Sequence, residues 1–261
     1  MTPLFARDGA TVLPSPFTRG PWDPGLLHGG PVGALFAETL QEVMDPAFAP
    51  VRLTVDLMKP VPMQELDVDV RVVRTGRRLQ LLEGEVRFGG TPVARASLLA
   101  LRPVPLVGDG FNPEVVVPAD TPDAAVDHWG LDPDQESFIG GAMDFRFILN
   151  EGQLGGGVAW FRLRRDVFDD GVAPSPLARA AAASDVGGAV SARRGAEFPS
   201  VSFINADISV HLAREPEGEW IRLTSSSTWE PTGIGAVASE LSDVAGPFGR
   251  AHQALVLEVR G

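Results

Sequence analysis

The amino-acid sequence predicts an α+β protein made of two similar halves, each with one helix lying against a curved antiparallel sheet. Alternating apolar and polar residues between glycine, proline or charged turns are typical of antiparallel strands. In both halves a helix opened by a proline precedes a series of such runs. Three strand sequences also recur in the same order in the second half, which indicates an internal repeat whose two sheets can join into one.

The first half begins with a helix that Pro31 opens and that ends before Pro46. Apolar residues recur at intervals of three and four between Val32 and Met44, while Glu38 lies among the polar residues of the opposite side. Strand-like segments follow at 51–60, 65–74, 79–88 and 92–102.

Between Leu106 and Ser137 the composition shifts to Pro, Asp, Gly and Val without sustained periodicity. Because this stretch is too long for an ordinary turn, we expect residues 106–137 to connect a first repeat, 1–105, to a second, 138–261. The order of elements then returns. It comprises strand-like segments at 143–149 and 157–164, a helix at 176–192, and strand-like segments at 201–213, 218–229, 233–243 and 249–260.

The repeat is visible in three pairs of segments. They are TVDLMKP (54–60) with SVHLAREP (209–216), ELDVDV (65–70) with EWIRLT (219–224), and GTPVARASLLALR (90–102) with GPFGRAHQALVLEVR (246–260). This alignment matches Gln253 with Leu98. Exchange of an apolar residue for an amide between similar strands indicates that only one copy carries a site.

Composition excludes several classes of protein. A net charge of −12 and a pI near 4.8 argue against nucleic-acid binding. The absence of cysteine removes disulfides, thiolate metal ligands and a cysteine nucleophile, and the four histidines show no metal-binding spacing. The chain has no Gly-x-Ser-x-Gly elbow, dinucleotide fingerprint, export signal or membrane-length apolar run. We therefore expect a soluble cytoplasmic protein without metal or cofactor.

Asp185 is the only charged residue between Ala180 and Ala192, in a helix that is small and apolar on nearly every side. A buried carboxylate is costly without partners, so it indicates a functional site or a structural pair. Asn205 begins the next strand and by period two shares a face with Asp207, Ser209 and His211, a face that can equally be solvated.

The first helix follows His28-Gly29-Gly30. Glycines at a helix start leave backbone N–H groups open to a carbonyl oxygen or an anion, although Gly-Gly-Pro also forms an ordinary helix entry. Such donors can stabilise the oxyanion that forms when a carbonyl carbon is attacked. We expect His28 to support this loop rather than to transfer protons.

Four segments together resemble the tandem-hotdog acyl-CoA thioesterases of the thioesterase II type, common in actinobacteria. They are WDPGLLHGGPVGAL at 22–35, the helix containing ASD at 183–185, FINADISVHLAREPEGEW at 203–220 and GPFGRAHQAL at 246–255. The resemblance covers essentially the whole chain. It implies a double hotdog fold, an acyl-CoA substrate, and a homodimer or higher homo-oligomer.

The resemblance also implies roles for individual residues. Asp185 takes the position of the Asp that holds the hydrolytic water in thioesterase II, and Gln253 takes that of its Gln. The Thr position falls on Asn205, whose amide offers a different donor and acceptor arrangement from a hydroxyl. The expected reaction is hydrolysis of an acyl-CoA by a water activated at Asp185.

Similarity to single-hotdog thioesterases with a His-Gly-Gly motif sets Gly29 and Gly30 of the first copy against Asp185 of the second. The corresponding carboxylate of the first helix would fall at Ala37, one residue short of Glu38, which implies one competent and one vestigial site.

An acyl chain would lie between helix and sheet. A non-catalytic acyl-CoA or lipid-binding protein is the alternative. A hotdog hydratase is disfavoured, because Val190 stands where its His would be.

Overall fold

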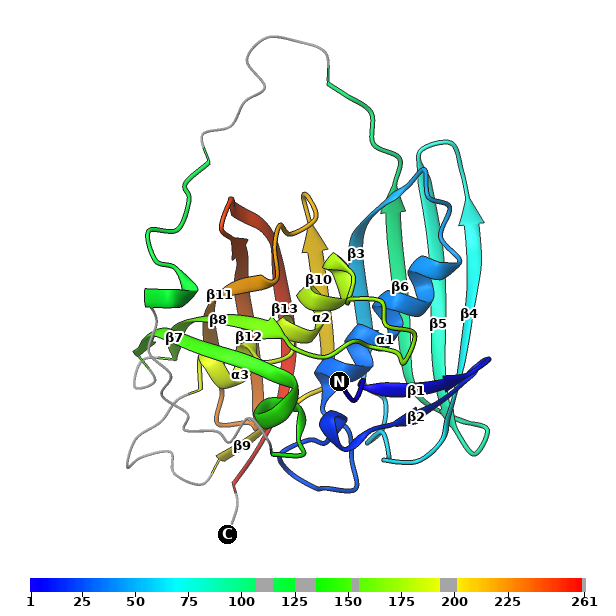
Figure 1. Ribbon diagram of the computed structural model, residues 1–261. Coiled ribbons are helices and arrows are strands. Elements are labelled where there is room, and N and C mark those ends of the chain that lie inside the picture. The colour runs from blue at the N-terminus through cyan, green and yellow to red at the C-terminus, as the bar shows by residue number, and fades with distance from the viewer. Residues whose placement is uncertain (107–114, 125–134, 152–154, 193–200, 260–261) are drawn as a thin grey trace.

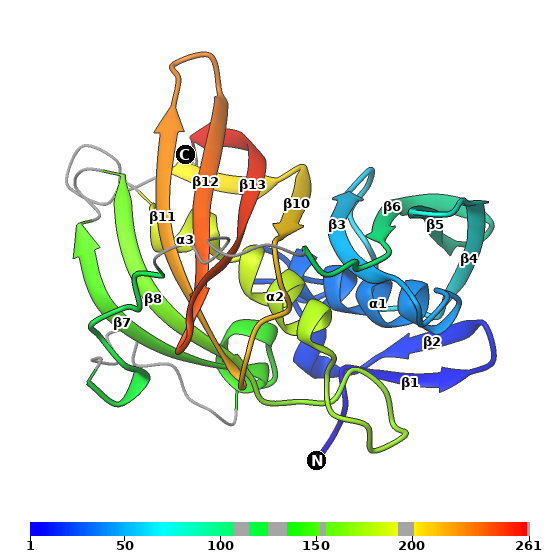
Figure 2. The same cartoon turned by 90° about the horizontal axis from the view of Figure 1, so that it is seen from above.

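The computed structural model describes residues 1–106, 115–124, 135–151, 155–192 and 201–259. Helices α1 (Gly29–Glu42) and α2 (Pro176–Ser184) lie side by side, and one long antiparallel sheet curves around them (Figures 1 and 2). The predicted α+β class is therefore confirmed. Within the described ranges, no helix is both long enough and apolar enough to cross a membrane.

Strands of the first half are β1 (Phe5–Asp8), β2 (Thr11–Pro14), β3 (Ala49–Asp56), β4 (Leu66–Thr75), β5 (Leu79–Phe88) and β6 (Thr91–Leu101). Those of the second half are β7 (Met143–Glu151), β8 (Gly156–Leu163), β9 (Val201–Asn205), β10 (Asp207–Leu212), β11 (Trp220–Trp229), β12 (Ile234–Asp243) and β13 (Gly246–Val259). A second short helix, α3 (Gly187–Val190), follows α2.

The two halves meet where β3 pairs with β10, with Thr54 opposite Ser209. From this junction the strand order is β3-β6-β5-β4-β2-β1 in one direction and β10-β13-β12-β11-β8-β7 in the other, with β9 paired to β13. Apart from β9, each strand thus has a counterpart in the other half. The internal repeat is present in the structure as two like sheets joined edge to edge (Figure 2).

Strand pairing tests the alignment of the repeats residue by residue. Thr54 pairs with Ser97 in one half and Ser209 with His252 in the other, so Leu98 and Gln253 occupy equivalent positions as predicted. The match of ELDVDV with EWIRLT is wrong by one residue, because the chain of cross-strand partners makes Asp69 equivalent to Thr224. A shift of one residue exchanges the two faces of a strand, and the structure settles which face is buried.

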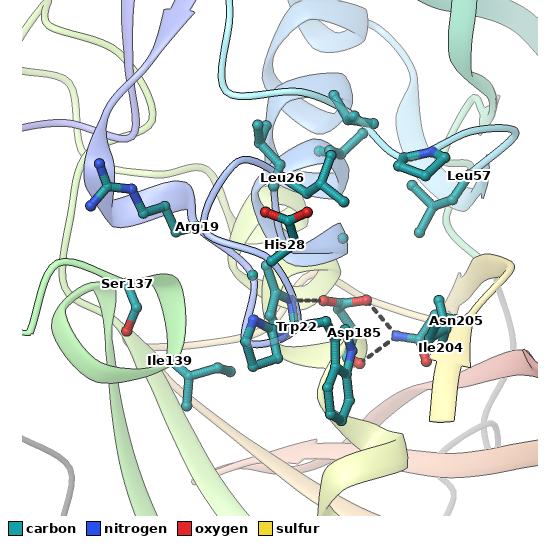
Figure 3. A pocket seen from close by; sticks show the side chains of 18 of the residues that line it. Arg19, Trp22, Leu26, His28, Leu57, Ser137, Ile139, Asp185, Ile204 and Asn205 are labelled. Atoms are coloured by element: carbon teal, nitrogen blue, oxygen red, sulfur yellow. Dashed lines mark hydrogen bonds and ion pairs between the residues drawn. The ribbon is translucent and has the colours of Figure 1, made fainter. Parts of the chain in front are cut away.

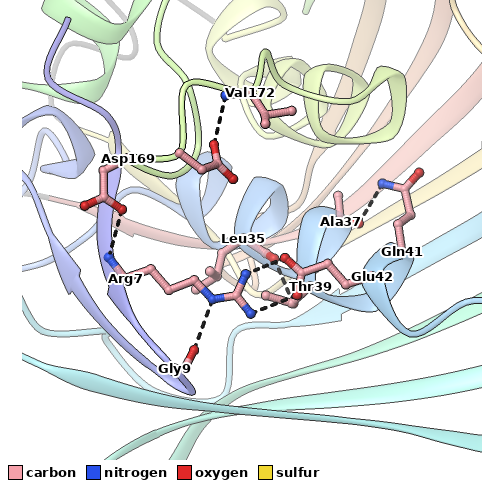
Figure 4. Close-up of polar contacts among 10 residues, drawn as sticks. Arg7, Gly9, Leu35, Ala37, Thr39, Gln41, Glu42, Asp169 and Val172 are labelled. Atoms are coloured by element: carbon pink, nitrogen blue, oxygen red, sulfur yellow. Dashed lines mark hydrogen bonds and ion pairs between the residues drawn. The ribbon is translucent and has the colours of Figure 1, made fainter.

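The N-terminal hairpin β1–β2 was not predicted, although its two-residue loop, Gly9-Ala10, has glycine in the first place, and Gly9 adopts a φ of +60°. The backbone N–H groups of Leu4 and Phe5 donate to the backbone carbonyls of Asp166 and Val167 in the second half. Arg7 forms an ion pair with Glu42 of α1, and its backbone N–H donates to Asp169 (Figure 4). The hairpin therefore ties the two halves together.

Part of the predicted connection, residues 115–124, is described and lies against the second half. Asp120 accepts hydrogen bonds from the Arg222 guanidinium and from Trp160 Nε1 at 2.7 Å. The bonds from Arg222 hold the pKa of Asp120 below its ordinary value. The boundaries of the repeats at 105/106 and 137/138 stay a prediction.

Candidate functional site

The helix predicted over 176–192 is interrupted at Asp185. Helix α2 ends at Ser184 and α3 begins at Gly187. The backbone carbonyl of Asp185 accepts side-chain amide N–H groups of Asn205 at 2.8 Å and Gln253 at 3.0 Å. Since this carbonyl is bound by two strands, the chain turns away from a continuous helix here and presents the Asp185 side chain to the start of α1.

The Asp185 carboxylate lies between the two halves and contacts both. Its Oδ1 accepts from Asn205 Nδ2 at 2.6 Å, and its Oδ2 accepts from the Gly30 backbone N–H at 2.6 Å and is in contact with His28 Nδ1 (Figure 3). Only 1% of the side chain is exposed. The structure thus brings together the residues that the sequence proposed, from α1, the α2–α3 break and β9.

His28 is the N-cap of α1, and its Nδ1 lies 3.5 Å from the Gly30 N–H. The much shorter Gly30–Asp185 distance assigns that N–H to the carboxylate. His28 Nδ1 and Asp185 Oδ2 are in contact, so the two side chains share one hydrogen between them. The His28 ring also packs on Phe138 with centroids 5.0 Å apart, so it contacts both the loop and the acid, and its role stays a prediction.

Glycine is required where α1 approaches Asp185. A methyl group on Gly29 would lie 2.5 Å from Asp185 Oδ1, and one on Gly30 would lie 2.5 Å from the Phe138 ring. The first turn of a helix has N–H groups without intrahelical acceptors, which makes this end attractive to negative charge. The two glycines let the helix terminus come within hydrogen-bonding distance of the carboxylate.

Asn205 faces Asp185 because of a register shift in the sheet. Asn205 pairs with Leu255 and Ser209 with His252, so four residues on one strand span three on its partner. This extra residue near Ala206 turns Asn205 to the inner side, while His211 stays exposed on the outer side. The expectation that Asn205 shares a face with Asp207, Ser209 and His211 is therefore wrong.

Gln253 lies on β13 behind the Asp185 backbone and is 4% exposed. Its Nε2 holds the Asp185 carbonyl, while its Oε1 is buried without a partner among the described residues. That oxygen would lie 3.2 Å from a methyl group on Gly187. From β13, Gln253 thus holds the backbone at the break between α2 and α3. Gln253 does not line the cavity described next.

A cavity of about 920 Å³ opens next to Asp185. Loops 19–29, 57–61 and 135–140 form its walls with the α3 segment and β9, so it lies at the start of α1 and not between α1 and the sheet. The space between α1 and the sheet is filled by Phe36 and Leu40, which are both fully buried. Most lining side chains are apolar. They include Trp22, Leu26, Leu57, Val61, Ile139 and Phe203.

Several of these lining residues were not predicted as site residues, Leu57 and Ile139 among them. Leu57 follows β3, where its N–H donates to the Ala206 carbonyl across the junction of the halves. Ile139 belongs to a short helical turn, Phe138–Ala142, whose Gly140-Gly141 pair was the available sequence signal. Apolar residues in loops carry no periodicity, which explains why the sequence did not single them out.

Within the described residues, no three His, Asp or Glu side chains gather as a metal site would require.

The first helix carries a carboxylate equivalent to Asp185, but it is Glu38 and not Ala37. Glu38 stands as far from the N-cap His28 as Asp185 stands from the N-cap Ser175. Glu38 Oε1 accepts from the backbone N–H of Ser175, the N-cap of α2, at 2.7 Å, whereas Asp185 accepts from Gly30, two residues beyond the N-cap of α1. At this second place Leu98 replaces Gln253, so the amide support is missing.

Burial raises the pKa of Glu38, against the opposing effect of hydrogen bonds from Ser175. A carboxyl whose folded pKa is raised stabilises the protein fully below its unfolded pKa, and this contribution is lost as pH rises through the folded value. Glu38→Gln keeps the oxygen acceptor but cannot ionise. We expect its melting temperature, relative to wild type, to be higher at pH 7 than at pH 4, as thermal unfolding at both pH values would measure. A difference that does not vary with pH would contradict the burial of an ionised group here.

Comparison with known proteins agrees with this architecture. The model of the acyl-CoA thioesterase N-terminal domain matches residues 18–101, and that of the acyl-CoA thioesterase C-terminal domain matches residues 108–257. No curated protein sequence matches significantly.

Solved structures with the same fold align along nearly the whole chain. A protein of unknown function with a hot dog fold from Alicyclobacillus acidocaldarius has a TM-score of 0.73 and 15% identity, over 98% of this chain and 96% of its own. An acyl-CoA thioesterase II from Mycobacterium marinum has a TM-score of 0.68 and 14% identity, over 94% and 98%. Together, the two domain matches and the double hotdog fold show that this chain belongs to the acyl-CoA thioesterase family.

Proposed function

We propose that this protein hydrolyses acyl-CoA thioesters to a free acid and CoA, with Asp185 as the base that activates the attacking water. The observation that carries this proposal is one buried carboxylate, held by donors from both halves, in the wall of an otherwise largely apolar cavity of about 920 Å³. An apolar cavity with a few convergent polar groups is the usual form of a site for an acyl chain.

The proposed water binds to Asp185 Oδ1, which has one lone pair beyond the bond from Asn205. As the water oxygen attacks the thioester carbon, its proton passes to the carboxylate and negative charge develops on the carbonyl oxygen. The first-turn N–H groups of Gly29 and Gly30 are the nearest backbone donors for that oxyanion. Before substrate binds, the Gly30 N–H donates to the Asp185 carboxylate. As that carboxylate takes up the proton and loses its charge, the Gly30 N–H donates to the oxyanion instead. Collapse of the intermediate then expels the CoA thiolate, which takes up the proton held by Asp185 and so restores the carboxylate.

Asn205 and Gln253 have different tasks in this proposal. Asn205 donates to both the carboxylate and the carbonyl of Asp185, so it orients the base directly. Gln253 contacts only the Asp185 carbonyl and acts as a positioning residue. An amide that spans two oxygens of one residue replaces the hydroxyl that thioesterase II resemblance would place at position 205.

The alternative is a protein that binds acyl-CoA without efficient turnover. One observation favours it: both Asp185 oxygens already accept hydrogen bonds, and the side chain is 1% exposed. A water would have to reach Oδ1 along the cavity wall near Leu57. The choice between the two functions depends on whether substrate binding leaves room for that water.

Release of free thiol from acyl-CoAs decides between them. We expect the wild-type protein to release CoA, detected with a chromogenic thiol reagent, from at least one member of a series with short, long and aromatic acyl groups. The chain has no cysteine and therefore gives no background. If no acyl-CoA yields thiol while one of them raises the melting temperature, the protein is a binder and the hydrolytic proposal fails.

A further inference from the structure

We propose that Lys59, at the rim of the cavity, binds the phosphates of CoA and thereby selects CoA as the thiol. This inference rests on the proposed function, because it assigns one end of the same cavity. Lys59 is the only lysine of the chain, and its side chain is exposed on the cavity lining. The thioester would lie inside at Asp185 and the charged nucleotide outside at Lys59.

The backbone around Lys59 is fixed from two sides. The Lys59 N–H donates to the Val93 carbonyl at 3.0 Å, and the Leu57 N–H donates to the Ala206 carbonyl at 2.9 Å. On the other side the Leu27 N–H donates to the Val61 carbonyl at 2.8 Å. These bonds anchor the backbone of residues 57–61 between the sheet junction and the loop before α1, and they thereby place Lys59 on the rim.

Lys59 is the cation of this rim that remains available to a ligand. Arg19, the other cation of the lining, pairs with Glu136 at 3.3 Å. Among the described residues, Lys59 has no ion-pair partner. On a protein with a net charge of −12, a polyanionic nucleotide is repelled on average, so an unneutralised cation at the entrance has a large relative effect.

The rest of the rim suits the uncharged part of CoA. Trp22, Met58 and Ile204 line the cavity yet are 42%, 46% and 40% exposed. Large exposed apolar side chains gathered at an entrance indicate a ligand contact. The pantetheine arm can cross them on its way to Asp185, whereas phosphates need the lysine. A thiol without the nucleotide would lose the contact with Lys59.

The first test measures how fast Lys59 is acetylated, which is possible because the chain has a single lysine. An amine acetylating reagent can modify only the Lys59 ε-amino group and the α-amino group, and mass spectrometry of peptides distinguishes them. We expect saturating desulfo-CoA to slow acetylation of Lys59 by about fivefold or more without slowing that of the α-amino group, whereas pantetheine protects neither. Absence of protection by desulfo-CoA, or equal protection by pantetheine, would overturn the assignment.

The second test is kinetic and separates this inference from the proposed function. Lys59→Gln is expected to raise the KM for acyl-CoA by about 5- to 10-fold at low salt, on the scale of one charge-assisted contact. The ratio of KM for acyl-CoA to KM for acyl-pantetheine should rise accordingly, Lys59→Arg should restore it, and added salt should reduce the effect. Arg71→Gln, on the outer face of β4, is the control.

The outcomes are distinguishable. If acyl-CoA is hydrolysed but that ratio does not change in Lys59→Gln, the lysine has no role in selection and the proposed function stands. If no acyl-CoA is hydrolysed, the proposed function fails while acetylation still tests nucleotide binding. Faster hydrolysis of an acylated carrier protein than of acyl-CoA would overturn the selection of CoA.

Discussion

Replacement of Asp185 by Asn is expected to lower kcat for acyl-CoA hydrolysis by roughly 100-fold or more, the usual contribution of one general acid or base. Asn keeps the size of the side chain and an oxygen that can accept from the Gly30 N–H. It cannot take a proton from water. Its amide N–H₂ would also face the donor N–H₂ of Asn205, so the base position is lost while the cavity remains.

Thiol release from the best acyl-CoA would be measured for wild type and Asp185→Asn side by side, with melting temperatures to show that both are folded. Glu83→Gln is a matched carboxyl-to-amide control, because Glu83 lies on β5 in an exposed pair with Arg71. The control should retain wild-type turnover. A variant at position 185 that retains more than a tenth of wild-type kcat would exclude Asp185 as the base.

A single turnover in H₂¹⁸O distinguishes the base from a nucleophile. If Asp185 activates water, the acid formed in the first turnover contains one ¹⁸O atom, because the attacking oxygen comes from solvent. If the carboxylate itself attacked the thioester and water then cleaved the anhydride at the Asp185 carbonyl, the label would first appear in Asp185, so ¹⁸O in this residue would identify a nucleophile. Mass spectrometry of the product acid and of the peptide that contains residue 185 measures both.

Arg214→Met is expected to lower the free energy of unfolding by about 3 kcal/mol, because it leaves a buried carboxylate without its cation. The Asp243 side chain is 0% exposed and accepts two guanidinium bonds from Arg214, at 2.6 and 2.7 Å. Backbone N–H groups of Glu217 and Ala245 complete its shell. Arg214 itself is 33% exposed, which places the effect at the lower end for buried pairs.

Urea unfolding at pH 7 would measure this loss, with Arg71→Met as the control. Arg71 and Glu83 are 70% and 43% exposed, so breaking their pair should cost at most about 1 kcal/mol. Equal losses in the two variants would contradict a special role for the buried pair, which closes the turn between β12 and β13.

The same pair predicts a pH dependence. Burial opposes ionisation of Asp243, but the bonds from Arg214 and from two backbone N–H groups hold its pKa below the ordinary value of 3.8. A lowered folded pKa contributes stability that is present above the unfolded value and lost as pH falls through the folded one. The difference in the free energy of unfolding between wild type and Arg214→Met should therefore become smaller below about pH 4.

Much of the fold followed from local patterns in the sequence. Alternation at 79–88 and 92–102 predicted β5 and β6 almost to the residue, and the apolar spacing after Pro31 predicted α1. Asp185 was singled out as the one charge in an apolar helix, and Gln253 by its mismatch with Leu98 in the other repeat. These signals are local, because burial of one face imposes its period on the chain.

What the tertiary structure alone decided lies at the junction of the halves. The break at Asp185 exists because two amides from β9 and β13 capture its carbonyl, and Asn205 faces it because one extra residue shifts the register of β9. Likewise, Glu38 is the equivalent carboxylate because of how α1 and α2 lie against each other. Such contacts join residues far apart in sequence, so period and composition do not encode them. The sequence by itself determined the elements and the acidic residue, and packing of the two repeats determined which groups surround it.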